Sequence, residues 1–263
     1  MRPIRYPAPV LDKLMFLARN LILIWISMAA APCHAQDARE VVDAAVRYYR
    51  GQSSVCVMDM TILRPHWQRT LTIRAWTKGQ KDSIFFIIAP PKDEGNGTLK
   101  KGKEMWTYNP KINQVMKLPP SMMSQAWMGS DFSNDDLAKS DSIIEDYDHT
   151  LEGQEVHEGK KVYRIKSLPK PGAPVVWGMQ RLKIREDHIL LGQEFFDEEM
   201  KLVKALTSGQ IRRMGGKLFP KTWDMSKAEA EGEHTVVDYR EIRFDADLPD
   251  RLFTVPALKT TWK

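Results

Sequence analysis

The sequence predicts a mainly β protein of the α+β class, in which one wide antiparallel sheet curls and a helix packs inside or across the curve. At about residue 54 the spacing of apolar residues changes from near four to two, and roughly ten strand-like stretches follow with short turns between them. Parallel strands would need a crossover of a dozen or more residues each time, so these strands form an antiparallel meander. A sheet this wide rarely stays open and flat, so it must curl.

The first 35 residues predict a secretory signal peptide. Four basic residues precede the apolar run 21–26, and small residues follow up to Ala35. Pro32 disfavours cleavage after Ala31, so we expect cleavage after Ala35 and a mature chain of residues 36–263 that forms a single domain. The alternative, an uncleaved membrane anchor, suits the sequence less well because the apolar run is short.

Charge and cysteine content argue against a nucleic-acid-binding protein and against a protein stabilised by disulfides. The formal net charge is +5, and residues 1–35 contribute +3 through four basic residues and Asp12, which leaves 5 − 3 = +2 on the mature chain. A chain so close to neutral lacks the basic surface that nucleic acid binding needs. Lipidation of Cys33 is disfavoured by the proline before it, and cleavage would leave Cys56 alone. We therefore expect no disulfide and predict that Cys56 is a small buried hydrophobe.

The mature chain is predicted to open with one amphipathic helix at about 37–50. Val42, Ala45, Val46 and Tyr49 fall at helical spacing, and Gly51 can end the helix in a left-handed turn.

Strands are predicted along most of the remaining chain, because apolar and polar residues alternate there. The predicted stretches are 54–62, 69–78, 82–90, 104–110, 113–119, 161–169, 179–187, 190–197, 201–211, 217–226 and 235–244.

The long interruption, at about 119–142, is predicted to hold two short helices. Met122, Met123, Ala126 and Trp127 fall on one stripe of a helix that Gly129 would end. Ser133 then suits the N-cap of a second helix, with Asp136 in the position of a capping box. A plain helical plug of the curved sheet is one interpretation. The flexible methionines favour another, a surface that accepts variable apolar shapes.

No catalytic residue, metal ligand or cofactor site is predicted, and we expect a protein that is not an enzyme. Hydrolase, nucleotide-binding and metalloprotease motifs are absent from the sequence. The stretch 131–137, "DFSNDDL", is similar to the start of a calcium loop, but Asp136 stands where glycine is required and Ser142 stands where the bidentate acid belongs. The acids at 197–199 fit a hairpin turn better than a catalytic pair.

Several stretches resemble the outer membrane lipoprotein-sorting family of the LolA/LolB-like superfamily. They are "WMGSDFSNDDL" at 127–137, "IREDHILLGQEFFDEEMKLVKALTSGQI" at 184–211, "GGKLFPKTWDM" at 215–225 and "DLPDRLFTVPAL" at 247–258. The resemblance implies an incomplete antiparallel β-barrel whose apolar concave face is covered by helices. It also implies a periplasmic protein that holds acyl chains of a lipoprotein or another lipid.

From this resemblance and the methionine content we predict a cavity closed by a movable lid. The predicted lid residues are Met122, Met123, Trp127 and Met128. The predicted cavity residues are Met58, Met60, Phe86, Ile88, Trp106 and Met116. Two or three acyl chains would fill the cavity, at about 0.8 kcal/mol for each buried methylene.

The expected partners are an inner-membrane transporter and an outer-membrane acceptor, and the chain is expected to be a monomer. Two alternatives remain open: an accessory or adaptor subunit of a membrane transporter that uses the methionine and tryptophan cluster as a protein interface, and a lipid-modifying hydrolase without known motifs.

Overall fold

The structure, a computed structural model, describes residues 37–259. The predicted signal peptide, with Cys33 and the expected cleavage site at Ala35, lies outside the described residues. Within residues 37–259, no helix is long and apolar enough to cross a membrane.

The predicted opening helix is confirmed as α2 (Ala38–Arg50). The Asp37 side chain caps its N-terminus by accepting a hydrogen bond of 2.9 Å from the backbone N–H of Arg39. Gly51 follows the helix with a φ of 65°, which glycine adopts without steric cost. One face of α2, including Val42 and Ala45, is buried.

Within residues 37–259, thirteen strands form one antiparallel sheet, and eleven of them lie where the alternating pattern predicts strands, whereas β4 and β7 do not. They are β1 (Ser53–Arg64), β2 (Trp67–Lys78), β3 (Asp82–Ala89), β4 (Gly97–Lys101), β5 (Glu104–Asn109), β6 (Gln114–Lys117), β7 (Tyr147–His157), β8 (Lys160–Pro169), β9 (Met179–Arg185), β10 (Leu190–Phe196), β11 (Leu202–Met214), β12 (Lys217–Lys227) and β13 (His234–Phe244). The spatial order is β6-β5-β4-β3-β2-β1-β13-β12-β11-β10-β9-β8-β7, so every strand except β1 and β13 pairs only with its neighbours in the chain.

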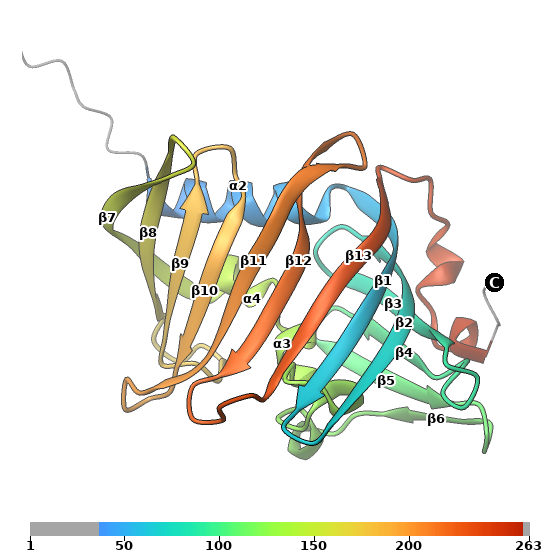
Figure 1. The fold of residues 1–263 in the computed structure, drawn as a ribbon. Coiled ribbons are helices and arrows are strands. Elements are labelled where there is room, and N and C mark those ends of the chain that lie inside the picture. The colour runs from blue at the N-terminus through green and yellow to red at the C-terminus, as the bar shows by residue number, and fades with distance from the viewer. Residues whose placement is uncertain (1–36, 260–263) are drawn as a thin grey trace, which may run out of the picture. The chain divides into compact units, whose positions relative to one another are not determined.

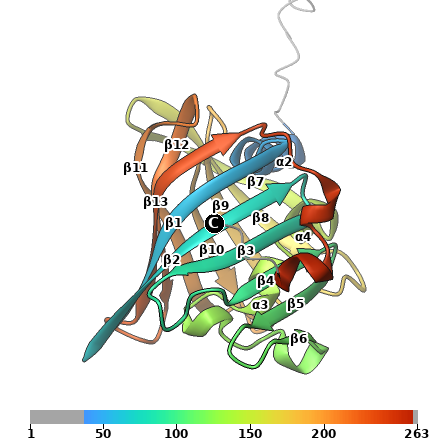
Figure 2. The ribbon, with the colours of Figure 1, turned by 90° about the vertical axis from the view of Figure 1, so that its right-hand side faces the viewer.

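The sheet curls but does not close into a barrel (Figures 1 and 2). Its two edges are β6 and β7, which are consecutive in the chain, and residues 118–146 connect them. This connection, which contains α3 (Asn134–Ala138) and α4 (Ser142–Glu145), lies with α2 on the concave face of the sheet (Figure 2). The predicted fold class, a curled meander with helices covering its concave face, is confirmed.

The connection differs from the prediction in its first half. The chain forms two 3₁₀ turns there, η1 (Pro120–Met122) and η2 (Trp127–Gly129), in place of one helix. Met128 has a φ of 54°, and Ala126 pairs with Ser133 as an isolated bridge, so the stretch 126–133 is a closed loop. A regular helix cannot contain a left-handed residue, which explains the difference.

The second half of the connection agrees with the prediction. Ser133 caps α3 through a complete capping box, in which its side chain accepts from the backbone N–H of Asp136 and the Asp136 carboxylate accepts from the backbone N–H of Ser133.

Apolar side chains are buried on both faces of the sheet. The concave face carries the main core, which includes Met58, Met60 and Trp223. The convex face of β3 to β5 is covered by η3 (Asp250–Leu252) and η4 (Val255–Lys259), and the buried side chains there form a separate cluster. Those side chains are Ile84, Phe86, Leu99, Leu248, Leu252, Phe253, Ala257 and Leu258.

Cys56 lies in the main core and is 6% exposed, as predicted for a small buried hydrophobe. Burial raises the pKa of its thiol to about 12, so the reactive thiolate is scarce at neutral pH.

Candidate functional site

A cavity of about 310 Å³ lies on the concave face, between the sheet, α2 and the connection between β6 and β7. The side of α2 that faces it presents Val42, Ala45, Val46, Tyr49 and Arg50, at the spacing of one helical stripe. Strands on the opposite wall contribute Leu206, Trp223 and Tyr239, among others. The lining is predominantly apolar, as is usual for sites that take a small organic ligand.

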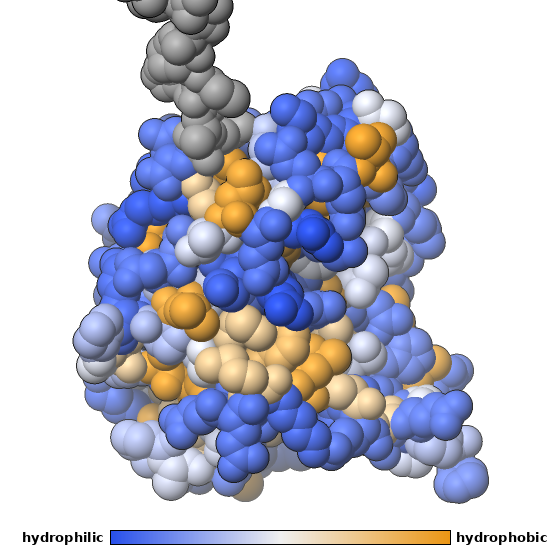
Figure 3. All heavy atoms as spheres, turned by 90° about the vertical axis from the view of Figure 1, so that its left-hand side faces the viewer, coloured by the Kyte–Doolittle hydropathy of each residue, from blue (hydrophilic) through white to orange (hydrophobic). Residues whose placement is uncertain are grey.

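The cavity extends to the protein surface near the loop between β8 and β9. Val176 in that loop lines the cavity and is 47% exposed. On the side of the protein where β7 and β8 lie, apolar surface is surrounded by hydrophilic side chains (Figure 3). A ligand could therefore enter without crossing the sheet.

Among the four predicted lid residues, Trp127 is the one that lines the cavity. It is 5% exposed and lines the cavity. Its indole Nε1 donates a hydrogen bond of 3.1 Å to Thr98 Oγ1 of β4. Its ring packs edge-on against Phe85, with 5.4 Å between the ring centroids. Met122, Met123 and Met128 are partly buried against the same core but do not line the cavity.

The predicted cavity residues divide into three groups. Met58 lines the cavity, and Met60 is fully buried in the adjoining core without reaching it. The structure places Phe86 and Trp106 in the cluster on the convex face. Ile88 is partly buried and Met116 is 40% exposed on edge strand β6, and neither lines the cavity.

The alternation in β3 explains the placement of Phe86. Phe85 and Ile87 face the main core on the concave side, whereas Ile84 and Phe86 face η3 and η4. Because both faces of this strand are buried, alternation alone does not tell which set faces the cavity. The apolar residues in the C-terminal stretch 248–258 could have indicated that this segment covers the convex face of the sheet.

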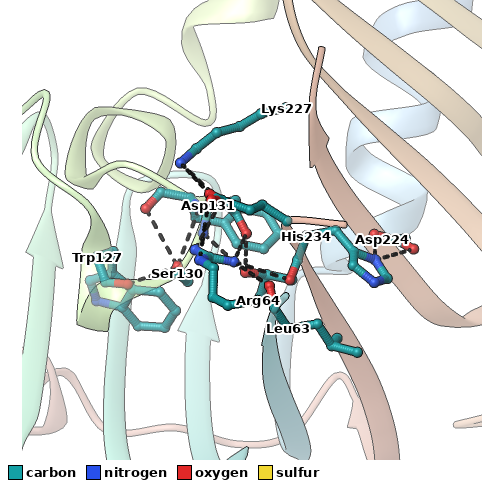
Figure 4. Close-up of polar contacts among 11 residues, drawn as sticks. Leu63, Arg64, Trp127, Ser130, Asp131, Asp224, Lys227 and His234 are labelled. Atoms are coloured by element: carbon teal, nitrogen blue, oxygen red, sulfur yellow. Dashed lines mark hydrogen bonds and ion pairs between the residues drawn. The ribbon is translucent and has the colours of Figure 1, made fainter. Parts of the chain in front are cut away.

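A buried ion pair attaches the loop 126–133 to the sheet (Figure 4). The Asp131 side chain is 0% exposed, and its two carboxylate oxygens accept hydrogen bonds of 3.0 Å from Nη1 and Nη2 of Arg64 in β1. Thr235 Oγ1 of β13 donates to the same carboxylate at 2.6 Å, and Lys227 Nζ of β12 lies 3.3 Å away. This bidentate arrangement fixes both distance and orientation.

Two further acidic residues attach the rest of the connection. Asp136 forms an ion pair with Lys204 of β11, and both side chains are less than 10% exposed. Asp141 lies 3.1 Å from Lys100 Nζ of β4, with both side chains again nearly buried. Desolvation lowers the pKa of Lys100, and the charge of Asp141 opposes that shift. Nearly buried ion pairs thus attach the connection to β1, β4 and β11.

Sequence reasoning found Asp131 and Asp136 only as parts of a motif, and it missed their basic partners. Those partners lie 67 and 68 residues away along the chain, so only the fold brings them together.

Two pairs of polar side chains on the cavity wall form hydrogen bonds with each other. The hydroxyls of Tyr49 and Tyr239 share a hydrogen bond, and burial raises the pKa of Tyr49 to about 12. Gln180 accepts a hydrogen bond from Gln193. Within residues 37–259, no three His, Cys, Asp or Glu residues gather as a metal site.

Comparison with known proteins identifies a family whose model matches this chain and solved structures with the same fold. A family model described as "Uncharacterized protein" matches residues 79–260. No curated protein matches the chain.

Three solved structures superpose closely. A DUF1329 family protein from Desulfovibrio piger is 26% identical, with a TM-score of 0.74, and the match covers 84% of this chain and 99% of that one. A putative outer membrane lipoprotein-sorting protein domain from Vibrio parahaemolyticus is 21% identical, with a TM-score of 0.74 and coverage of 84% and 98%. A LolA superfamily protein from Nitrosomonas europaea is 23% identical, with a TM-score of 0.70 and coverage of 85% and 100%.

Proposed function

Because this chain belongs to the family whose model spans residues 79–260, and has the LolA-like fold of outer membrane lipoprotein-sorting proteins, we propose that it is a carrier for acyl chains. In this proposal residues 1–35 direct export and are removed, and residues 36–263 act as one domain in the periplasm. The carrier takes a lipoprotein or another lipid from an inner-membrane transporter and passes it to an acceptor at the outer membrane.

The observation that supports this proposal is the apolar cavity under α2 and the connection. Each methylene that leaves water for such a cavity contributes about 0.8 kcal/mol, so acyl chains bind by burial alone. A transporter adaptor needs an exposed interface and has no use for an internal cavity. The cavity therefore favours the carrier over the adaptor.

Release in this proposal requires the connection to move. Asp131, Asp136 and Asp141 attach it through ion pairs that are largely buried. Removing one partner of such a pair is costly, so opening without help is rare. A membrane or partner protein that contacts the connection would supply the differential binding energy that opening needs.

Filling the cavity tests the proposal. Leu206 lines it and is only partly buried, so Leu206→Trp places a larger side chain into free space. We expect the dissociation constant for a fluorescent fatty acid to rise at least tenfold, because the indole displaces roughly two methylenes of ligand. The measurement is a fluorescence titration of the purified mature protein.

The matched control is Leu218→Trp on the neighbouring strand β12, where Leu218 is 37% exposed and does not line the cavity. This variant should bind like the unaltered protein. Equal affinities for the two tryptophan variants, or no binding by the unaltered protein, would refute the proposal.

A further inference from the structure

One cation on the cavity wall is left without a carboxylate partner. The charged residues that line the cavity are Arg50, Asp135, Asp136 and Lys139. Asp135 pairs with Lys139 at 2.9 Å, and Asp136 pairs with Lys204. Among the described residues, Arg50 forms no ion pair, and Asp141 and Asp82 act on its charge only from beyond ion-pair distance, so Arg50 is the cavity cation without a direct carboxylate partner.

The position of Arg50 on α2 is unusual. It occupies the end of the same helical stripe as Val42, Val46 and Tyr49, which is the side facing the cavity. Basic residues in the last turn of a helix are usually exposed, and they interact favourably with the helix dipole there. Arg50 differs because it lies over the cavity.

Part of the guanidinium has a structural role. Nε donates to the carbonyl of Gly79 at 2.9 Å, and Nη2 donates to the carbonyl of Asp82 and to Ser83 Oγ at 3.3 and 3.0 Å. These bonds hold the end of α2 against the turn between β2 and β3. Within residues 37–259, the hydrogen bonds of Arg50 come from Nε and Nη2 alone, so Nη1 of the guanidinium remains available. Burial lowers the pKa of Arg50, and the negative charges of Asp141 and Asp82 oppose that shift without cancelling it.

We propose that the ligand of this cavity is a single-chain amphiphile with an anionic head, whose carboxylate or phosphate oxygens bind Nη1 of Arg50 while its chain lies along the apolar wall. This inference rests on the proposed carrier function and adds the class of ligand. A planar guanidinium in a poorly solvated site suits such an oxyanion through short charge-assisted hydrogen bonds.

The volume of the cavity agrees with one chain. At about 30 Å³ for a group the size of a water molecule, 310 Å³ takes roughly ten carbon atoms. This volume corresponds to a stretch of one chain, and the two or three chains expected from the sequence stay a prediction.

The test compares three ligands that share a ten-carbon chain: decanoate, decyl phosphate and decanol. The unaltered mature protein is titrated with each ligand by calorimetry at pH 7.5. We expect the tighter-binding anion to bind roughly ten to a hundred times more tightly than decanol, because hydrogen bonds to a charged group contribute that much. The stronger of the two anions identifies the head group as carboxylate or phosphate. This comparison does not depend on any variant.

Arg50→Gln should remove the preference for the anion and leave the affinity for decanol within about threefold, and Arg50→Lys should restore part of the preference. The unchanged affinity for decanol also shows that the cavity is still folded. Equal binding of anions and alcohol by the unaltered protein would overturn this inference and leave the carrier function intact. No binding of any of the three ligands would overturn both.

Discussion

Replacing Asp131 with alanine is expected to lower the free energy of unfolding by about 3–5 kcal/mol. The carboxylate is fully buried and receives hydrogen bonds from Arg64 and Thr235. Without it, Arg64 keeps its charge in a site where its side chain is only 13% exposed. Arg64 Nε then keeps only Glu233, at 3.7 Å, as a carboxylate partner, so most of the cost of desolvating its charge is no longer offset. Chemical denaturation followed by tryptophan fluorescence measures the change.

Glu104→Ala is the matched control, because Glu104 pairs with Lys117 on the surface and both side chains are about half exposed. Such pairs contribute about 0–1 kcal/mol. A double-mutant cycle with Arg64→Ala isolates the interaction energy of the buried pair. Energies of separate mutations add to within about 0.5 kcal/mol. If the free energy of unfolding of Asp131→Ala lies within that margin of the unaltered protein, the buried pair does not hold the connection.

Replacing Trp127 with alanine is expected to reduce both stability and ligand binding. Removal of a buried tryptophan costs about 3–5 kcal/mol, since the side chain packs against Phe85 and donates to Thr98. The same change removes a wall of the cavity, so acyl chains regain contact with water and the dissociation constant for a fluorescent fatty acid should rise severalfold. Denaturation and titration are measured on the same sample.

Trp106→Ala is the control that separates the two effects. Trp106 packs in the cluster on the convex face, away from the cavity. It should therefore lower stability without changing the dissociation constant. A Trp127→Ala variant that binds as tightly as Trp106→Ala would show that Trp127 does not form part of the binding site.

The sequence predicts the general architecture because its signals are local. The alternation in β1 and the helical spacing in α2 are properties of a few consecutive residues, and so are the Gly51 terminus and the Ser133 capping box. Two strands were missed for local reasons as well. Strand β4 is only five residues long, and β7 has exposed residues along most of its length, so neither carries a strong apolar pattern.

The details of the cavity depend on contacts between distant residues. Whether Phe85 or Phe86 faces the cavity is decided by η3 and η4, which cover the convex face from more than 160 residues away along the chain. The apolar stripe at 122–127 predicts a helix, but Met128 turns left-handed and the loop is held by Asp131 and Arg64. Arg50 was missed because an arginine at the end of a helix has an ordinary local explanation.

If this protein is a carrier, its cavity holds an acyl chain in the cell. Native mass spectrometry of the protein purified gently from the cells that express it detects such a chain, with Leu206→Trp as the comparison. We expect part of the unaltered protein to carry extra mass, which organic solvent releases as an acyl-containing anion. A much smaller part of the variant should carry this mass. A single mass equal to that of the polypeptide in both samples, with no acyl compound in the extract, would contradict it.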